Sequence, residues 1–488
     1  MSNAGHAASL RGLKRRALSL GAVKVFDHAM QFVLPVVLVR CLDAANFGEY
    51  RLLWLAVGTV MAVATLNMVG SLYYFVPRSE PQRRRLYINQ TLIFLSAVGA
   101  LWAFVFSHWN PALPAALEPL AAHGWVVPAF VALWVVTFLL DHLPSVDERL
   151  SWQAGVTLGT SALRIVLVAL AAWFTGEMRV MLWALLAVGL FKAALLVYYL
   201  GRRHGLGSPW FERTAFSEQV RHSAPIGLSN SLNGLRGKAD QWVAASLFAV
   251  SSFAAFSIAA LVSHLMLVLR ASVMQTFLPS MSRLQAKGDV RGMLDMNSRG
   301  NVMVARLLYP LIAFAFVFAP EIVTLVYTAS YVEAVPAIRA YIIGMLPMAI
   351  ETSSMVLLLR RGGFMLRLTV LTLFLSIALS WTAALHLGLA GAAAGSVTAV
   401  YIDRFVLLRH LSRHTAIALG RLQDWRALLV ALGFAAATAA LAWALVERVA
   451  ADAGLLARLA VGGAVFALAY AAAYLRQVFS IRNRKDAT

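Results

Sequence analysis

Residues 180–200 read VMLWALLAVGLFKAALLVYYL, and Gly201-Arg202-Arg203 follows them directly. A helix needs about 20 apolar residues to cross the hydrocarbon core of a bilayer. Lys192 is the only charged residue in the stretch. Membrane proteins concentrate Lys and Arg in their cytoplasmic loops. The segment therefore predicts a membrane-spanning helix whose arginine end is cytoplasmic.

The composition of the whole chain agrees with this local pattern. Of its 488 residues, 60% are hydrophobic and only 13% are charged, whereas a soluble protein is roughly half apolar and one quarter charged. The net charge of +20 does not indicate nucleic-acid binding, because the basic residues lie between apolar runs. Cys41 is the single cysteine, which excludes an intramolecular disulfide and a cysteine-based metal site. We expect an all-α polytopic membrane protein.

Similar apolar runs recur along the chain and predict about fourteen transmembrane helices, with twelve as the lower limit. Loops rich in Lys and Arg alternate with loops that have few or none, such as 108–123, which contains no Lys or Arg. This alternation predicts a multi-pass membrane protein with both termini cytoplasmic. The abundance of alanine and arginine with few lysines suggests a bacterial protein, so we expect it in the bacterial inner membrane. The expected spans are 17–42, 47–76, 87–107, 124–143, 150–174, 180–200, 217–248, 253–281, 299–325, 334–359, 364–386, 388–411, 427–447 and 454–476.

A weak internal repeat suggests how the spans are grouped. Phe47-Gly-Glu-Tyr50 is matched by Phe253-Ala-Ala-Phe256 at an offset of about 206 residues. Such duplications are common in transporters, with the substrate site between the two halves. We expect two six-helix lobes and a C-terminal helix pair. The predicted division is a basic N-terminus 1–16, an N-lobe 17–200, a cytoplasmic linker 201–216, a C-lobe 217–411, a basic linker 412–426, accessory helices 427–476 and a cytoplasmic tail 477–488.

The first expected span carries a polar stripe. Lys24, Asp27, His28 and Gln31 recur at helical spacing on one face, and polar groups at membrane depth must face a cavity or another helix. The stripe favours a cavity lining. Mutual neutralisation of Lys24 and Asp27 is the alternative.

The span 217–248 is also unusually polar, with Asn230, Asn233, Arg236, Lys238 and Asp240. Such density requires partners inside the protein, or water. Arg236 and Asp240 are four residues apart, which favours an ion pair on one helix. By the repeat offset, this span corresponds to the first one, so the two helices are a candidate cavity-lining pair.

Charged residues near the middle of other spans determine the net charge expected for the cavity. Arg164 and Arg270 lie near the middle of their spans, and Glu351 is a deep acid that either pairs with an arginine or carries a coupling proton. The cations outnumber the anions, so the cavity favours an anionic substrate. The cations are Lys24, Arg164, Arg236, Lys238 and Arg270, and the anions are Asp27, Asp240 and Glu351.

Several short segments together resemble one known group of transporters. The segments are Leu42-Asp-Ala-Ala-Asn-Phe-Gly-Glu-Tyr50, Tyr73-Tyr-Phe-Val-Pro77, Leu278-Pro-Ser-Met-Ser-Arg283, Phe318-Ala-Pro-Glu-Ile-Val323 and Gly388-Leu-Ala-Gly-Ala-Ala-Ala-Gly395. With them, the chain is similar to the O-antigen and exopolysaccharide flippases of the multidrug/oligosaccharidyl-lipid/polysaccharide exporter superfamily over about residues 15–410.

The resemblance implies two lobes around a V-shaped cavity, alternating access, and translocation of an undecaprenyl-diphosphate-linked oligosaccharide to the periplasmic leaflet. In the related lipid II flippases, cations on helices 1, 2 and 8 hold the diphosphate, and helices 13 and 14 help to form a lipid groove. Lys24 and Arg270 match two of those positions, with Arg164 and Lys238 as secondary cations. We expect no cofactor, and we expect coupling to H⁺, Na⁺ or the membrane potential through groups such as Asp27, His28 or Glu351.

The expected partners are a lipid-linked anionic oligosaccharide as substrate, membrane lipids, and the polysaccharide polymerase and export machinery; we expect a monomer and no nucleic acid. Within the superfamily, a lipid II flippase and a cation-coupled multidrug exporter are alternatives, although the exporter would need an acidic cavity. A membrane-embedded glycan polymerase or ligase would need a large catalytic loop. The longest bare loop offers only His108, Glu118 and His123, so we do not expect an enzyme.

Overall fold

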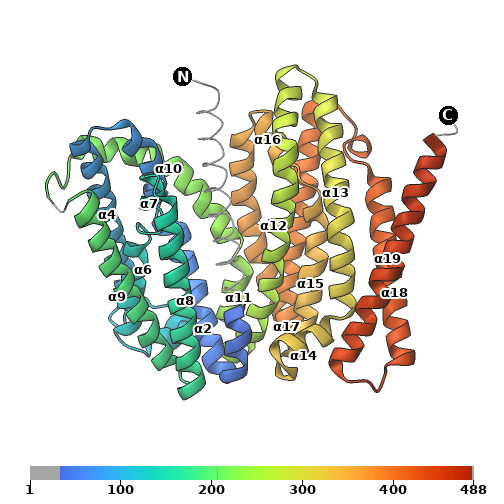
Figure 1. Ribbon diagram of the computed structural model, residues 1–488, viewed down its shortest axis with the longest axis horizontal. Coiled ribbons are helices and arrows are strands. Elements are labelled where there is room, and N and C mark those ends of the chain that lie inside the picture. The colour runs from blue at the N-terminus through green and yellow to red at the C-terminus, as the bar shows by residue number, and fades with distance from the viewer. Residues whose placement is uncertain (1–32, 206, 486–488) are drawn as a thin grey trace. The chain divides into compact units, whose positions relative to one another are not determined.

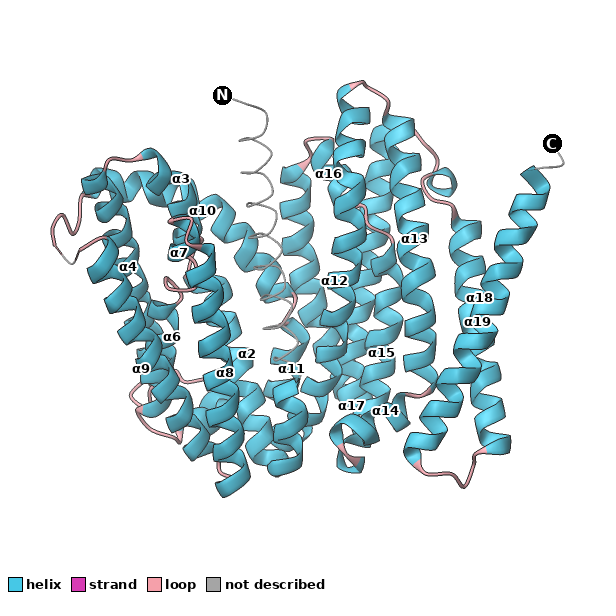
Figure 2. Ribbon diagram, viewed as in Figure 1, coloured by secondary structure: helices cyan, strands magenta, loops and turns pink. Residues whose placement is uncertain are grey.

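The structure is a computed structural model that describes residues 33–205 and 207–485, with side chains described except at 261–275 and 473–485. The described chain contains helices and loops and no strand (Figure 2). Contacts divide it into two compact units. The first comprises residues up to Lys238 together with Ala249–Ala254, and the second comprises Ala239–Phe248 and the chain from Ala255 onward.

In the first unit, α4 packs on α6, α6 on α9 and α9 on α8, while α10 packs on α2 and α3 (Figure 1). Its helices are α2 (Ala44–Ala64), α3 (Met68–Phe75), α4 (Pro81–Val105), α5 (Glu118–Ala121), α6 (Val126–Thr137), α7 (Leu143–Val146), α8 (Leu150–Thr175), α9 (Met178–Arg203) and α10 (Arg213–Arg236), with 3-10 turns at Val76–Arg78 and Ala115–Leu117. Local signals set several ends. The Asp43 carboxylate accepts a hydrogen bond from Asn46 N–H at the start of α2, and Gly176 ends α8 with φ 65°.

In the second unit, α17 packs on α11 and α15, and α13 packs on α18, which in turn packs on α19. Its helices are α11 (Ala239–Leu247), α12 (Val250–Ala286, of which the first residues belong to the first unit), α13 (Val290–Val317), α14 (Ala319–Tyr327), α15 (Val335–Met345), α16 (Ser353–Leu358), α17 (Gly362–Thr415), α18 (Trp425–Val449) and α19 (Leu455–Lys485), with 3-10 turns at Ala329–Ala334, Leu346–Ala349 and Leu419–Arg421.

The all-α polytopic membrane fold that the sequence predicts is confirmed. Within the described residues, nine helices are long and apolar enough to cross a membrane, or ten if one bent pair counts as a span. The count of fourteen stays a prediction, since several expected spans are broken into shorter helices. The span 334–359, for example, is interrupted between α15 and α16 by a 3-10 turn and by non-helical residues up to Thr352.

The unit boundary lies further along the chain than the predicted lobe boundary. The C-lobe is predicted to begin at residue 217, whereas the contacts of α10 with α2 and α3 place this helix in the first unit. The chain leaves α10 at Gly237 and starts α11 at Ala239. The predicted span 217–248 is therefore shared between the units.

One arginine adds ion pairs to the packing that holds the C-terminal helix pair on the rest of the second unit. Arg458 of α19 forms ion pairs with Glu447 of α18 and, at 3.1 Å, with Glu321 of α14. The Glu321 side chain is only 12% exposed. A carboxylate that is buried to this degree needs a cationic partner.

The Gly388–Gly395 segment forms a tight helical hairpin inside α17. Gly388 has φ 60° and ψ −144°, which separates the predicted spans 364–386 and 388–411. Gly391 and Gly395 then form a small-xxx-small motif. A Cβ at Gly391 would lie 2.0 Å from the Ala383 carbonyl oxygen, and one at Gly395 would lie 2.4 Å from the Leu379 backbone. The two arms of the hairpin therefore approach as closely as glycine allows.

Gly395→Ala is expected to lower the free energy of unfolding by about 1–3 kcal/mol, because the new methyl group meets rigid backbone. Thermal unfolding of the purified protein in detergent measures the change. Gly433→Ala in α18 is the matched control, since nothing lies within 4 Å of its Cβ position. Equal stability of the two variants would contradict this account of the hairpin.

Candidate functional site

A group of aromatic rings holds two cations inside the first unit. This group, the Trp134 cluster, consists of Trp54 of α2, Trp134 of α6, Arg164 of α8, Lys192 of α9, and Asp141, which follows α6. The Arg164 guanidinium lies 5.3 Å from the Trp54 ring and 5.8 Å from the Trp134 ring. Lys192 Nζ lies 4.7 Å from the Trp134 ring. Both cations are thus within reach of the ring quadrupoles.

The two cations differ in how their charge is balanced. Lys192 is buried, and its Nζ donates to Asp141 Oδ2 at 2.9 Å. Arg164 has no carboxylate partner among the described residues, and its buried Nε has no acceptor there. Aromatic faces offset only part of the cost of a charge at membrane depth. Among the described residues, Arg164 therefore places a positive charge inside the first unit that no carboxylate balances.

The polar residues expected on α10 lie at its C-terminal end. Asn230 and Asn233 are exposed, and Asn233 Nδ2 donates to the Ser229 carbonyl oxygen at 2.9 Å. Arg236 ends the helix and is half-buried. Lys238 lies beside Gly58 of α2, where a Cβ would come within 2.8 Å of its Nζ. The structure thus brings Lys238 against the middle of a neighbouring span.

Asp240 is fully enclosed in the second unit. The break at Gly237 removes the helical spacing that would align Asp240 with Arg236. The Asp240 carboxylate instead accepts from Tyr341 Oη at 2.8 Å and from its own neighbour Gln241 N–H at 2.8 Å. It is only 5% exposed, and no described cation pairs with it. A buried carboxylate without a cation favours the neutral form or a bound cation.

Glu351 stabilises a helix end. Its carboxylate accepts from Ser353 N–H at 2.8 Å and from Ser354 N–H at 3.2 Å, at the start of α16. Its carbonyl oxygen accepts from the buried amides of Asn297 and Asn301. The Glu351 side chain therefore caps the start of α16, a role that was not predicted from the sequence.

The other candidates either lie outside the described residues or contact a residue of another helix. Lys24, Asp27, His28 and Gln31 lie outside the described residues, and so does the side chain of Arg270. His123 contacts Glu49 of α2 at 2.7 Å. The segment from Phe106 to Trp125 holds α5 and a 3-10 turn.

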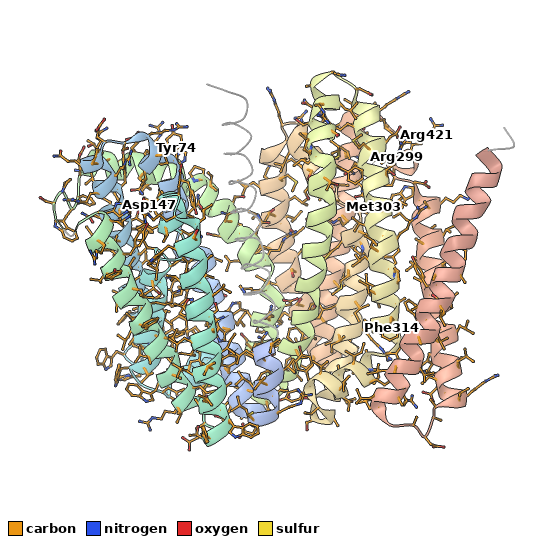
Figure 3. The ribbon with its side chains drawn as sticks, viewed as in Figure 1. Tyr74, Asp147, Arg299, Met303, Phe314 and Arg421 are labelled. Carbon is orange, nitrogen blue, oxygen red and sulfur yellow. The ribbon has the colours of Figure 1, made fainter. Side chains whose placement is uncertain are left out.

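A groove runs along α13 beside the C-terminal helix pair. It has a volume of about 710 Å³ and is lined by α13 residues that include Arg299, Met303 and Arg306, by Ala427 of α18, and by Tyr470 of α19. Figure 3 shows Arg299 and Arg421 near one end of this unit and Phe314 nearer the other. The groove combines two arginines and the Asp424 carboxylate with apolar walls, which suits an amphipathic lipid.

A polar cluster that was not predicted lies at the arginine end of the first unit, around Asp147. Tyr199 Oη donates to Asp147 Oδ2 at 2.6 Å, and His204 Nε2 donates to the same atom at 2.8 Å. Burial on its own would raise the pKa of Asp147, but these two hydrogen bonds and the charge of Arg203 outweigh it, so the pKa lies below its usual value. An acidic residue in a short turn between two apolar runs could have drawn attention to Asp147. Its partners could not be predicted, because they lie 52 and 57 residues further along the chain.

Comparisons with known proteins agree with this architecture. A family model described as polysaccharide biosynthesis protein matches residues 37–336. No curated protein matches the chain. An inward-facing MATE-family multidrug resistance transporter of the MOP superfamily has a TM-score of 0.63 at 16% identity, covering 80% of this chain and 95% of that chain.

Two further solved structures are similar. The lipid II flippase MurJ in an inward closed conformation has a TM-score of 0.68 at 12% identity, covering 94% of this chain and 99% of that chain. An outward-facing MATE-family transporter has a TM-score of 0.53 at 17% identity, covering 83% and 96%. These likenesses show the fold of the multidrug/oligosaccharidyl-lipid/polysaccharide exporter superfamily.

Asp147→Asn is expected to lower stability at pH 7 by about 1–3 kcal/mol, because hydrogen bonds to a charged group are lost or weakened. A depressed pKa stabilises the fold above the unfolded-state value, and this stabilisation is lost as the pH falls. The difference from the parent protein should therefore shrink below about pH 4. Thermal unfolding across pH measures it, with the exposed Asp452→Asn as control. A difference that does not vary with pH would refute the argument.

Proposed function

Since the chain belongs to the polysaccharide biosynthesis protein family, we propose that it is a flippase for an undecaprenyl-diphosphate-linked oligosaccharide. It moves this substrate from the cytoplasmic to the periplasmic leaflet of the bacterial inner membrane. The family match and the transporter fold support the proposal. The alternation of basic and bare loops supports the orientation, with both termini cytoplasmic.

The observation that carries the proposal is the unbalanced charge of Arg164. A guanidinium within a span, with no described carboxylate beside it, favours an anion. A diphosphate is such an anion, and guanidinium groups bind phosphate oxygens in a bidentate manner. A transporter for organic cations would be expected to have the opposite charge balance.

In this proposal, Lys24 and Arg270 hold the diphosphate, and Arg164 and Lys238 act as secondary cations. The substrate site alternates between the two faces of the membrane as the lobes rearrange. The groove along α13 accommodates part of the prenyl chain, because its walls include Val302, Met303 and Leu307. The saccharide remains in the aqueous path, where polar side chains such as Asn230 and Asn233 are exposed.

Asp240 is the coupling group in this proposal. Its carboxylate is enclosed and accepts from the Tyr341 hydroxyl, with no described cation beside it. Binding a proton or Na⁺ would remove the cost of burying the charge. Glu351 is less suited to this role, since backbone N–H groups already engage its carboxylate.

Arg164→Gln is expected to lower the flipping rate at least about tenfold, because one contact with a charged group contributes about 1.5–3 kcal/mol. Mass spectrometry of lipid-linked intermediates, together with assignment of the leaflet that holds them, measures the accumulation in cells. Deletion of the gene gives the reference for complete loss.

The matched control for Arg164 is Arg179→Gln, which removes the same charge from an exposed position of the first unit. It should leave export near the parent level. Normal export by the Arg164 variant would remove the observation on which the proposed function depends. A deletion strain without accumulated lipid-linked saccharide would reject the proposed substrate.

Asp240→Asn is expected to abolish the response of transport to a proton or sodium gradient, because the amide cannot exchange a cation. Flipping in proteoliposomes, with and without each gradient, measures the response. Tyr341→Phe keeps the carboxylate and should keep the coupling. A full gradient response in the Asp240 variant would place coupling at another group.

A further inference from the structure

A basic pocket lies at one end of the first unit, away from the Trp134 cluster. Its volume is about 470 Å³, and it belongs to one unit. We call it the arginine pocket. Three segments line it, namely the start of α4 with the turn before it, the turn between α7 and α8, and the end of α9. The lining side chains are Val76, Pro77, Pro81, Arg84, Arg85, Val146, Asp147, Glu148, Arg203 and His204.

The positive charges of the pocket exceed the negative charges that remain available. The Asp147 carboxylate is already engaged by Tyr199 and His204. Glu148 is the other lining carboxylate, and no hydrogen bond or ion pair joins it to the described arginines. Both carboxylates keep their negative charge, so the three guanidinium groups of Arg84, Arg85 and Arg203 exceed them by one charge. The pocket keeps a positive surplus that a bound anion would neutralise.

The arginines also retain unused donors. Arg84 Nε donates to the Ser79 carbonyl oxygen at 2.6 Å, which fixes the side chain and leaves its terminal nitrogens available. Arg85 Nη1 lies 3.5 Å from the Ser208 carbonyl oxygen. Arg85 Nε is buried with no described acceptor. A buried unpaired donor costs about 1–3 kcal/mol, and a ligand oxygen would remove that cost.

The chemistry of the pocket fits a phosphate group, since guanidinium forks match phosphate oxygens. Its surroundings fit a ligand held in the bilayer. Tyr74 and Tyr198 are exposed close in sequence to the lining residues, and each carries an arginine over its ring, at 4.0 Å and 5.7 Å. Exposed tyrosines and arginines mark the membrane–water interface. Figure 3 shows Tyr74 and Asp147 toward the same end of this unit.

We propose that the arginine pocket binds the phosphate-bearing headgroup of an anionic phospholipid. The phospholipid belongs to the leaflet at the arginine-rich end of the unit, which is the cytoplasmic leaflet by the positive-inside rule. The site is separate from the substrate cations, and it does not depend on the transported cargo. Its role is to fix the α4, α7–α8 and α9 ends against the membrane.

Native mass spectrometry of the full-length protein tests the proposal by titrating phosphatidylglycerol against phosphatidylcholine. The parent protein should retain one phosphatidylglycerol in preference to phosphatidylcholine. The Arg84→Gln/Arg85→Gln variant should bind it about 25-fold more weakly, at about fivefold for each arginine. Arg83→Gln is the matched control, because this neighbouring arginine does not line the pocket. It should retain at least tenfold more lipid than the double variant.

Glu148→Gln provides a second test that does not remove any arginine contact. Loss of the free carboxylate should strengthen phosphatidylglycerol binding about fivefold. Equal losses for Arg83→Gln and for Arg84→Gln measured singly would show general surface attraction and overturn the pocket. Displacement of the lipid by millimolar inorganic phosphate, but not by chloride at equal ionic strength, would assign the site to a soluble phosphate and overturn the phospholipid.

Discussion

A backbone carbonyl without a hydrogen-bond partner costs several kcal/mol inside a bilayer, and this constraint decides where the chain can leave a helix. Before α16, the Glu351 carbonyl oxygen accepts from Asn297 and Asn301. After α6, the Asp141 carbonyl oxygen accepts from Gln153 at 2.8 Å. Side-chain amides thus replace the helical hydrogen bonds at both breaks. Some polar residues at membrane depth therefore make the irregular backbone possible and do not contact a substrate.

The same environment divides the charged residues into two classes. Lys192 is paired with Asp141, and Arg458 is paired with two glutamates. Arg164 and Asp240 have no described partner of opposite charge. Balanced pairs hold helices in place, whereas an unbalanced charge is retained at a cost. A transport cycle that binds an anion and a coupling cation would use the second class.

The fold could be predicted because local composition determines a membrane helix. The stretch 180–200 is apolar enough by itself, and α9 occupies Met178–Arg203. The partners of charged residues could not be predicted, because they depend on the approach of distant segments. Lys192 meets Asp141 from 51 positions away. The helical spacing of Arg236 and Asp240 was misleading, since the break at Gly237 separates them. Of the candidate site, the sequence identified Arg164 and Asp240 but not their surroundings.

The double ion pair of Arg458 also has a mechanical meaning. Because it ties α19 to both α14 and α18, the terminal hairpin cannot swing outward without stranding the Glu321 carboxylate in an apolar setting. A hinge between α19 and α14 would thus be electrostatically unfavourable, because it would separate Arg458 from Glu321. Conformational changes during a transport cycle would then occur at other positions, and the last two helices would move with the rest of the second unit as one rigid body.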